Sequence, residues 1–113
     1  MSHYQPNIQD MQFVLSHVLN VSDQLKSLPV FEELEDELVQ QVLDEAGKFV
    51  GEVVAPLNRD GDEIGAQWQD GKVTMPPGFQ AAYQMFWKAG WPALSADTEH
   101  GGQGLPTVLE IML

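Results

Sequence analysis

The side chains best suited to acid–base or metal chemistry in this sequence are three histidines, His3, His17 and His100. They lie far apart along the chain, and no His-Glu-x-x-His pattern brings two of them to one helix face. The absence of cysteine excludes a disulfide framework, a thiolate nucleophile and a sulfur-ligated metal. The 17 acidic residues offer many carboxylate pairs, but none stands in an obviously apolar stretch that would tune a pKa for proton transfer. We therefore expect no metal site and assign no catalytic residue.

A glycine-rich run, Gly101-Gly102-Gln103-Gly104, is the second feature that could do chemistry, because such runs can bind phosphate. A dinucleotide-binding fingerprint beginning at Gly102 would need a third glycine where Thr107 stands, and no strand pattern precedes the run. We interpret the glycines as a crowded turn that leads into a helix, since such a turn needs residues without a Cβ. The same property would let a ligand approach, so proximity to a ligand stays open. For His100, a hydrogen-bonding role is favoured over a functional one.

The charge balance excludes polyanionic partners. The chain of 113 residues carries 5 Lys+Arg against 17 Asp+Glu, a formal net charge of −12, and its cations are scattered singly. Nucleic acids and anionic membranes are bound by clustered cations, so neither is expected as a partner. Residues 1–11 lack the positive segment of a signal peptide, and the apolar run at 13–15 ends at Ser16-His17. With 43% hydrophobic residues, we expect one folded domain. Because neither a signal peptide nor a membrane span fits the sequence, we expect this domain in the cytoplasm.

Hydrophobic periodicity predicts a mostly α-helical chain. Apolar residues recur at spacings of three and four in four segments, which predicts about four helices at residues 10–21, 35–54, 79–89 and 107–113. Residues 22–29 are expected to form a linker that becomes extended before Pro29. Asp70-Gly71 predicts a short hairpin or extended turn near residues 66–75. The aromatic stripe of residues 79–89 is interpreted as core, with a cofactor platform as the alternative.

Acidic segments flank the longest predicted helix. Five of the six positions 32–37 are acidic, which is favoured in the first turn of a helix, and a binding patch for a basic partner is the alternative. Pro56 lacks a backbone N–H and is expected to end or kink the helix near Ala55. Residues 58–63 resemble the start of a calcium loop, but Glu63 and Gln69 stand where that loop needs glycine and glutamate. We expect a solvated acidic turn there.

The sequence ends inside an apolar helical pattern, Glu110-Ile111-Met112-Leu113, with no glycine cap and no basic last turn. A helix of about seven residues is marginal unless it packs. We therefore expect the 113 residues to be part of a longer protein.

Motifs follow one another along nearly the whole chain. They are Tyr4-x-Pro6 with Asp10-Met11-x-Phe13-Val14-Leu15, Glu45-Ala46-Gly47-Lys48-Phe49, Val54-Ala55-Pro56-Leu57-Asn58 with Gly61-Asp62, and Gly90-Trp91-x-x-Leu94 with His100-Gly101-Gly102-Gln103-Gly104-Leu105-Pro106. In this order they resemble the N-terminal helical domain of acyl-CoA dehydrogenases. The first motif is similar to the N-terminal extension of a subgroup that includes the 3-methylmercaptopropionyl-CoA dehydrogenases.

The resemblance implies that residues 1–113, with a leader at 1–9, form the N-terminal helical domain of a flavoenzyme subunit, without the middle β-domain and the C-terminal helical domain. Enzymes of this family oxidise an acyl-CoA to the trans-2-enoyl-CoA. A glutamate removes the α-proton, the β-hydrogen leaves as hydride to N5 of FAD, and electron-transfer flavoprotein usually accepts the electrons. The other two domains supply many flavin contacts and the catalytic base, so neither is assigned here. The chain alone is expected to be inactive and to hold no tightly bound FAD.

By the same resemblance, the glycine turn and the helix after it help to wall the acyl pocket. The residues expected near the substrate are His100, Gly101, Gly102, Gly104, Leu105, Leu109, Ile111 and Met112. The first five form the turn, and the last three lie on the helix, where burial would hold an acyl chain at about 0.8 kcal/mol per methylene. Ordinary helix packing is the alternative for those last three.

Two hypotheses for function follow. The first is the N-terminal portion of an FAD-dependent acyl-CoA dehydrogenase, whose parent enzyme would have acyl-CoA and electron-transfer flavoprotein as partners. The second is a stand-alone helical module for protein interaction or oligomerisation, without enzymatic activity. In both, the surface that would meet absent domains is expected to be apolar and exposed, and such patches drive association. We therefore expect a homo-oligomer.

Overall fold

The computed structural model of the chain describes residues 4–113, so His3 and the start of the expected leader lie outside the described residues. The α-helices are α1 (Ile8–Phe13), α2 (Val21–Leu25), α3 (Asp36–Phe49), α4 (Asn58–Glu63), α5 (Phe79–Lys88) and α6 (Thr107–Met112). The strands are β1 (Gln67–Gln69) and β2 (Lys72–Thr74). Wider π-helical turns extend α1 over Val14–Val18 and α3 over Val50–Val54, and 3-10 turns span Pro29–Phe31, Ala55–Leu57, Trp91–Ala93 and Thr98–His100. The mostly helical fold with a small hairpin is confirmed.

Two expectations about the connections were wrong. The expected linker 22–29 begins inside α2, where Val21 and Ser22 are buried and the Ser22 hydroxyl donates a hydrogen bond to Asp36 Oδ1. The expected acidic turn at 58–63 is α4. The chain stays helical past Pro56 because this proline lies in the first turn of a 3-10 segment, where its missing N–H costs no hydrogen bond. Pro56 therefore changes the winding of the helix without ending its path.

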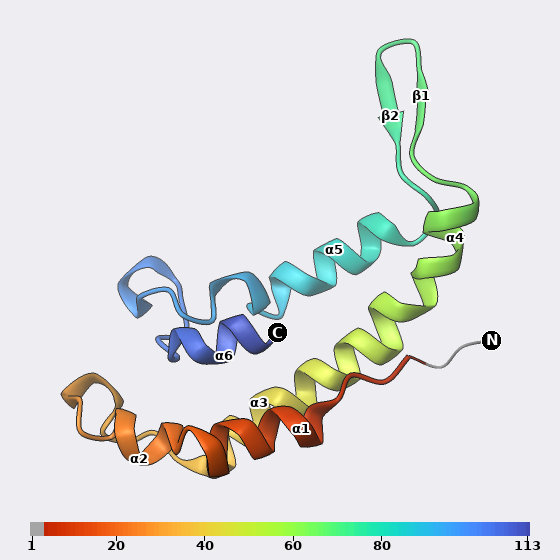
Figure 1. The fold of residues 1–113 in the computed structure, drawn as a ribbon. Coiled ribbons are helices and arrows are strands. Elements are labelled where there is room, and N and C mark those ends of the chain that lie inside the picture. The colour runs from red at the N-terminus through yellow and green to blue at the C-terminus, as the bar shows by residue number, and fades with distance from the viewer. Residues whose placement is uncertain (1–3) are drawn as a thin grey trace.

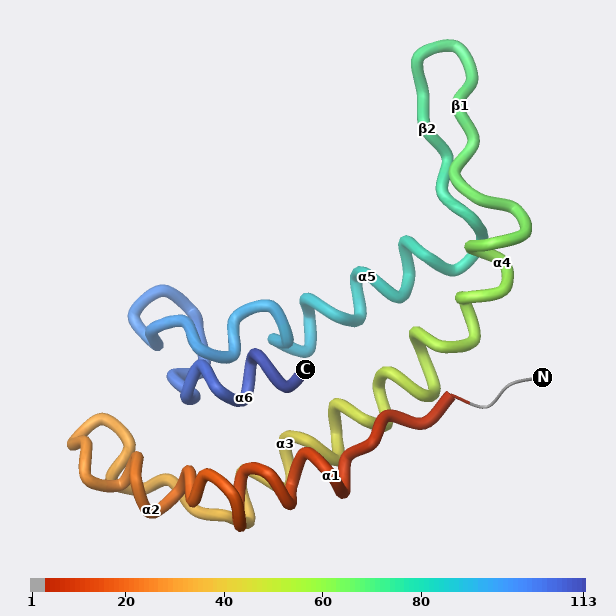
Figure 2. The backbone as a smooth tube through the Cα atoms, in the orientation of Figure 1, coloured from red at the N-terminus to blue at the C-terminus, as the bar shows by residue number. Residues whose placement is uncertain are grey.

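The helices form two arms that meet at α4 (Figures 1 and 2). One arm is the continuous path from α3 to α4, with α1 packed along α3. The other is α5, which runs back from α4, and the β1–β2 hairpin projects outward near the point where the arms meet. Tight contacts hold this junction, because a Cβ on Gly61 would lie 2.8 Å from Phe79 and one on Gly78 would lie 2.7 Å from Leu57. Farther along the arms, the Phe49 ring lies 6.3 Å from that of Phe86 and 6.2 Å from that of Trp91.

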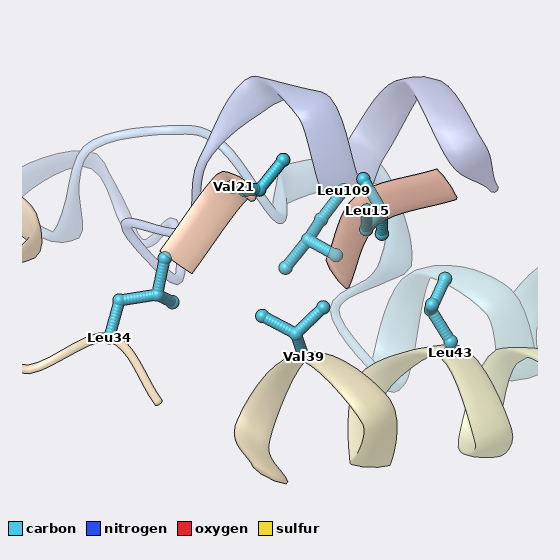
Figure 3. Packing of buried hydrophobic residues seen from close by; sticks show 6 residues of the cluster. All are labelled: Leu15, Val21, Leu34, Val39, Leu43 and Leu109. Atoms are coloured by element: carbon cyan, nitrogen blue, oxygen red, sulfur yellow. The ribbon is translucent and has the colours of Figure 1, made fainter. Parts of the chain in front are cut away.

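The hydrophobic core lies at the end of the long arm away from the hairpin (Figures 1 and 3). Its buried members come from the segment between α1 and α3, from α3 itself and from α6, and they are Leu15, Val21, Leu34, Val39, Leu43 and Leu109. Burial of such a side chain stabilises the fold by about 1.5–3 kcal/mol. This small cluster therefore holds α6 against α3, although the two helices are far apart in sequence.

Helix α5 contributes no buried residue to the core, so the interpretation of its aromatic stripe as core was wrong. Tyr83 is 66% exposed and Trp87 54% exposed. The spacing of these aromatic residues does predict a helix, but periodicity alone cannot say whether a partner covers the apolar face.

The molecule is open. Its radius of gyration is 17.2 Å, whereas a compact domain of this length has about 13 Å. Its accessible surface is 8327 Å², and a compact monomer of 12.6 kDa exposes about 6200 Å². Figure 2 shows the two separated arms and the hairpin that projects from them. No helix between residues 4 and 113 is long and apolar enough to cross a membrane.

Candidate functional site: the glycine turn and helix α6

The glycine turn begins with a capped 3-10 segment. Asp97 Oδ1 accepts a hydrogen bond from the backbone N–H of Glu99 at 3.1 Å, which satisfies a donor at the start of Thr98–His100. Gly101 ends the segment with φ at +81°, and its N–H donates to the Thr98 carbonyl at 3.2 Å. A Cβ disfavours the left-handed backbone conformation, so glycine at position 101 lets the chain reverse.

After this reversal, residues 101–105 lie against residues 93–97. The N–H groups of Gly102 and Gly104 donate to the carbonyls of Asp97 and Ala96, both at 2.9 Å. Those of Gln103 and Leu105 donate to the carbonyls of Ala93 at 3.0 Å and Leu94 at 2.8 Å. The backbone donors of the turn are therefore used inside the chain and are not free to bind phosphate.

Gly102 is required by close approach of the backbone. A Cβ at this position would lie 2.0 Å from the Ala96 carbonyl oxygen. Because this oxygen belongs to the backbone, no side-chain rotation could relieve the overlap. The interpretation of this glycine as crowded backbone is confirmed at Gly102.

The segment against which the turn packs is joined to α6 by a side-chain hydrogen bond. The hydroxyl of Ser95 donates to the carboxylate of Glu110, and both groups are partly buried. Pro106 immediately precedes α6 and is itself buried, and its carbonyl accepts from the Leu109 N–H at 3.0 Å. The position of α6 is thus coupled to that of the turn.

The eight residues expected near the substrate form one stretch but point in different directions. His100 and Gly101 are exposed, and Gly102, Gly104 and Leu105 are half-buried. On α6, Leu109 is 0% exposed in the core, Met112 is half-buried against the core, and Ile111 is 78% exposed. Leu109 therefore makes the packing contact that was the alternative, and Ile111 presents the largest free apolar surface of the three.

The sequence analysis did not predict a groove that the structure contains. A groove of about 910 Å³ lies between the two arms, and it is lined by Tyr4, Phe49, Val50, Val54, Ala55, Pro56, Leu57, Asn58, Arg59, Asp60, Phe79, Ala82, Tyr83 and Phe86. The lining is mostly apolar and aromatic, and its charged residues are Arg59 and Asp60. The exposed aromatic stripe of α5 was the signal for this groove, but it was interpreted as core.

Within residues 4–113, no three His, Asp or Glu side chains come together as a group that could hold a metal ion.

Comparison with known proteins identifies a relative. No family model matches the chain. The chain is 40% identical over 106 residues to 3-methylmercaptopropionyl-CoA dehydrogenase of Ruegeria pomeroyi, a match that covers 94% of this chain but only 18% of that enzyme. Because the match spans 106 of the 113 residues, most of the motifs quoted above lie within it. The resemblance to an acyl-CoA dehydrogenase is therefore confirmed, and this chain is related to such an enzyme over nearly all of its own length.

Proposed function

We propose that this chain is the N-terminal helical part, with its leader at 1–9, of an FAD-dependent acyl-CoA dehydrogenase. The observation that carries the proposal is the 40% identity, which extends over 94% of this chain and 18% of the related enzyme. In this proposal the parent enzyme dehydrogenates an acyl-CoA thioester between its α- and β-carbons in the cytoplasm and passes electrons to electron-transfer flavoprotein. The flavin and the catalytic base are held by parts of the enzyme beyond these 113 residues.

The residues of this chain do not fit a flavin site of their own. FAD carries a pyrophosphate, and the N–H groups of Gly102, Gln103 and Gly104 already donate to backbone carbonyls. Arg59 lines the groove between the arms, but its Nε is 2.8 Å from Glu63, so part of its charge is already compensated. We therefore assign no FAD-binding residue in this chain, and the chain alone neither retains FAD nor turns over substrate.

The contribution of this chain is one wall of the acyl pocket. In the proposal, His100, Gly101, Gly102, Gly104 and Leu105 lie beside the substrate as the turn, and α6 lies along its acyl chain. Ile111 supplies apolar surface and Met112 its flank, while Leu109 holds α6 to the core from the opposite side. Each methylene buried against such a wall contributes about 0.8 kcal/mol of binding.

The test is made in the enzyme encoded by the complete reading frame. Ile111→Ala should raise KM for acyl-CoA substrates, and the rise should grow with acyl length, because less apolar surface is buried in each complex. Val73→Ala, which shortens a side chain that is 63% exposed on the β1–β2 hairpin, is the matched control and should leave KM unchanged. Equal KM values for Ile111→Ala and the unaltered enzyme at every acyl length would contradict the pocket-wall role.

The inactivity of the chain alone has its own test. The purified 113-residue chain is mixed with FAD, dialysed and assayed with acyl-CoA and an artificial electron acceptor. We expect no retained flavin absorbance and no reduction of the acceptor. Stoichiometric flavin with turnover would refute the inactive-fragment proposal.

The second candidate is a helical module that acts by association alone. It is favoured by one observation, that α5 carries exposed aromatic residues and buries none. A reading frame that stops after Leu113 would support this candidate, and a frame that continues through a flavin-binding domain would support the dehydrogenase.

A further inference from the structure

A recess lies between the leader and the long arm, and we call it the leader recess. Its volume is about 730 Å³. Tyr4, Gln5, Pro6 and Ile8 line one side, and residues of α3 and of the turns that follow it line the other. Figure 1 shows the leader lying along this arm. The leader recess therefore exists only while residues 4–8 lie against the arm.

Tyr4 stands between the leader recess and the groove between the arms. Three residues line both spaces, namely Tyr4, Ala55 and Pro56. Ala55 and Pro56 belong to a 3-10 turn, whereas Tyr4 is 57% exposed and lies in a segment without regular secondary structure. Of the three, Tyr4 can therefore move away without unwinding a helix, and its departure would join the two spaces.

A single helical turn separates the leader recess from the groove. Gly51 and Glu52 line the leader recess, and Val50 and Val54 line the groove. All four belong to the π-helical turn Val50–Val54, and π turns inside longer helices are frequent at functional sites. The leader therefore packs on one side of the turn whose other side forms a wall of the groove.

The leader is held to the arm by packing. Of the backbone hydrogen bonds that residues 4–113 make, none joins residues 4–8 to the long arm, and the Ile8 N–H donates to the Pro6 carbonyl at 2.9 Å within the leader. A side-chain bond to α3 comes only from α1, where Gln12 Nε2 donates to Asp44 Oδ1 at 3.2 Å in an exposed position. Segments with few buried contacts open locally at a low free energy. The leader is therefore suited to leave the arm reversibly.

The contact is closest at one end of the leader. Ile8 is half-buried against the core, and a Cβ on Gly47 would lie 3.0 Å from Ile8 Cγ1 and 3.5 Å from Pro6 Cγ. A Cβ on Gly51 would meet only the Tyr4 carbonyl oxygen, at 3.7 Å. The leader is thus anchored at Ile8 and packed more loosely at Tyr4, so it can move away from its Tyr4 end.

From these observations we propose that residues 4–8 are a strap that moves between a docked and a released position. In the docked position Tyr4 separates the leader recess of about 730 Å³ from the groove of about 910 Å³. In the released position the two spaces form one continuous channel along the long arm, so the strap controls the length of that channel. The proposal concerns the leader and the arm, and it does not rest on the pocket-wall role of α6 and the glycine turn.

The first test follows the two tyrosines of the chain. Tyr4 and Tyr83 both line the groove, so fluorotyrosine in their places gives two fluorine NMR signals from this region. Tyr4→Phe and Tyr83→Phe assign the signals. Lid-like motions occur in microseconds to seconds, so we expect the Tyr4 signal to show relaxation dispersion or to split into two exchanging signals. A single Tyr4 signal without exchange would overturn the proposal.

The second test displaces the strap. Gly47→Leu places a larger side chain against Ile8, so the Tyr4 signal should move toward that of a free peptide of residues 1–9 and its exchange should disappear. Gly51→Ala adds only an ordinary contact and is the matched control, in which the exchange should remain. Helical circular dichroism checks the fold of both variants. A Tyr4 signal that keeps its docked position in Gly47→Leu would overturn the proposal.

The third test asks whether release joins the two spaces. The chain has no cysteine, so Ala55→Cys places a single thiol at the half-buried border that both spaces share. Val73→Cys, on the exposed hairpin, gives the rate of an unshielded thiol with the same neutral reagent. The ratio of the two rates should be below one and should rise severalfold when Gly47→Leu or Tyr4→Ser is added.

Tyr4→Ser keeps this test decisive if Gly47→Leu does not fold, because Tyr4 is exposed and its loss leaves the core intact. A ratio that Tyr4→Ser leaves unchanged would overturn the role of Tyr4 as the partition between the leader recess and the groove.

Discussion

The hydroxyl of Ser95 donates a hydrogen bond to the carboxylate of Glu110, and this contact joins the segment against which the glycine turn packs to α6 across fifteen residues of sequence. The backbone bonds of the turn run between residues 101–105 and 93–97, so they fix the shape of the turn. The Ser95–Glu110 bond instead fixes the position of α6, since it links residues 93–97 to this helix, which is proposed to line the acyl pocket. Its partners are partly buried, where a hydrogen bond to a charged group is worth more than in water.

Replacing Ser95 by alanine should therefore loosen α6. The variant leaves the Glu110 carboxylate partly buried without its donor, and we expect the free energy of unfolding to fall by about 1–3 kcal/mol. The measurement is urea denaturation followed by circular dichroism. Glu99→Gln, an exposed change in the same turn, is the control and should stay within about 0.5 kcal/mol of the unaltered chain. Equal losses in both variants would mean that Ser95 does not hold the helix.

Much of the secondary structure was predictable because its signals are local. The three-and-four spacing of apolar residues predicts α1, α3, α5 and α6, and Asp70-Gly71 predicts the β1–β2 turn, where Asp70 and Gly71 both have positive φ. Helix α2 was missed because its signal is tertiary. Its buried Ser22 is satisfied by Asp36, fourteen residues away, and no pattern within 22–29 reports that contact.

The candidate site was predictable as a location and not as a set of directions. Glycines without a Cβ predict a tight turn, and the structure has one there. Which face of α6 meets the core depends on how α6 crosses α3, and that crossing is set by residues far away in sequence such as Leu15 and Val39. The sequence therefore could not separate the buried Leu109 from the exposed Ile111. The groove was missed for a related reason, because the spacing of α5 predicts an apolar face and not what covers it.

The two glycines of the turn should respond differently to alanine. Gly101 has φ at +81° and open space around its Cβ position, so Gly101→Ala should cost only the left-handed strain of about 1–2 kcal/mol. Gly102→Ala would place a Cβ 2.0 Å from the Ala96 carbonyl oxygen and should cost at least about 3 kcal/mol because the backbone must move. Thermal and urea unfolding of the two variants measures the difference. If Gly101→Ala proved the more harmful of the two, the close approach at Gly102 would be disproved.

Alanine substitutions on α6 should separate packing from exposure. Leu109 is fully buried, so Leu109→Ala should lower the free energy of unfolding by about 2–5 kcal/mol through lost burial and a cavity. Ile111 lies two residues away on the same helix and is 78% exposed, so Ile111→Ala should change stability by less than about 0.5 kcal/mol. Urea denaturation measures both values. Leu109→Met, which keeps the volume, provides a folded variant if the alanine variant does not fold. If Leu109→Met and Ile111→Ala both leave the free energy of unfolding nearly unchanged, the value for Leu109→Ala decides. A small loss of stability in Leu109→Ala would contradict the place of Leu109 in the core.

The leader crosses the long helix at two glycines, and substitutions there should have opposite signs. A Cβ on Gly47 would lie 3.0 Å from Ile8 Cγ1, so the larger side chain of Gly47→Leu must displace the leader, at a cost of about 1–3 kcal/mol. At Gly51 the nearest atom to a Cβ would be the Tyr4 carbonyl oxygen at 3.7 Å, an ordinary contact. Gly51→Ala should therefore stabilise the chain by about 0.5–1 kcal/mol, since alanine loses less backbone freedom in a helix than glycine does. Urea denaturation gives both signs, and hydrogen exchange at the Met11 amide, which donates to the Asn7 carbonyl at 3.2 Å, reports the leader directly. Faster exchange at Met11 in Gly47→Leu but not in Gly51→Ala is the expected result. Unchanged exchange in Gly47→Leu would mean that the leader is not held against α3 at this glycine.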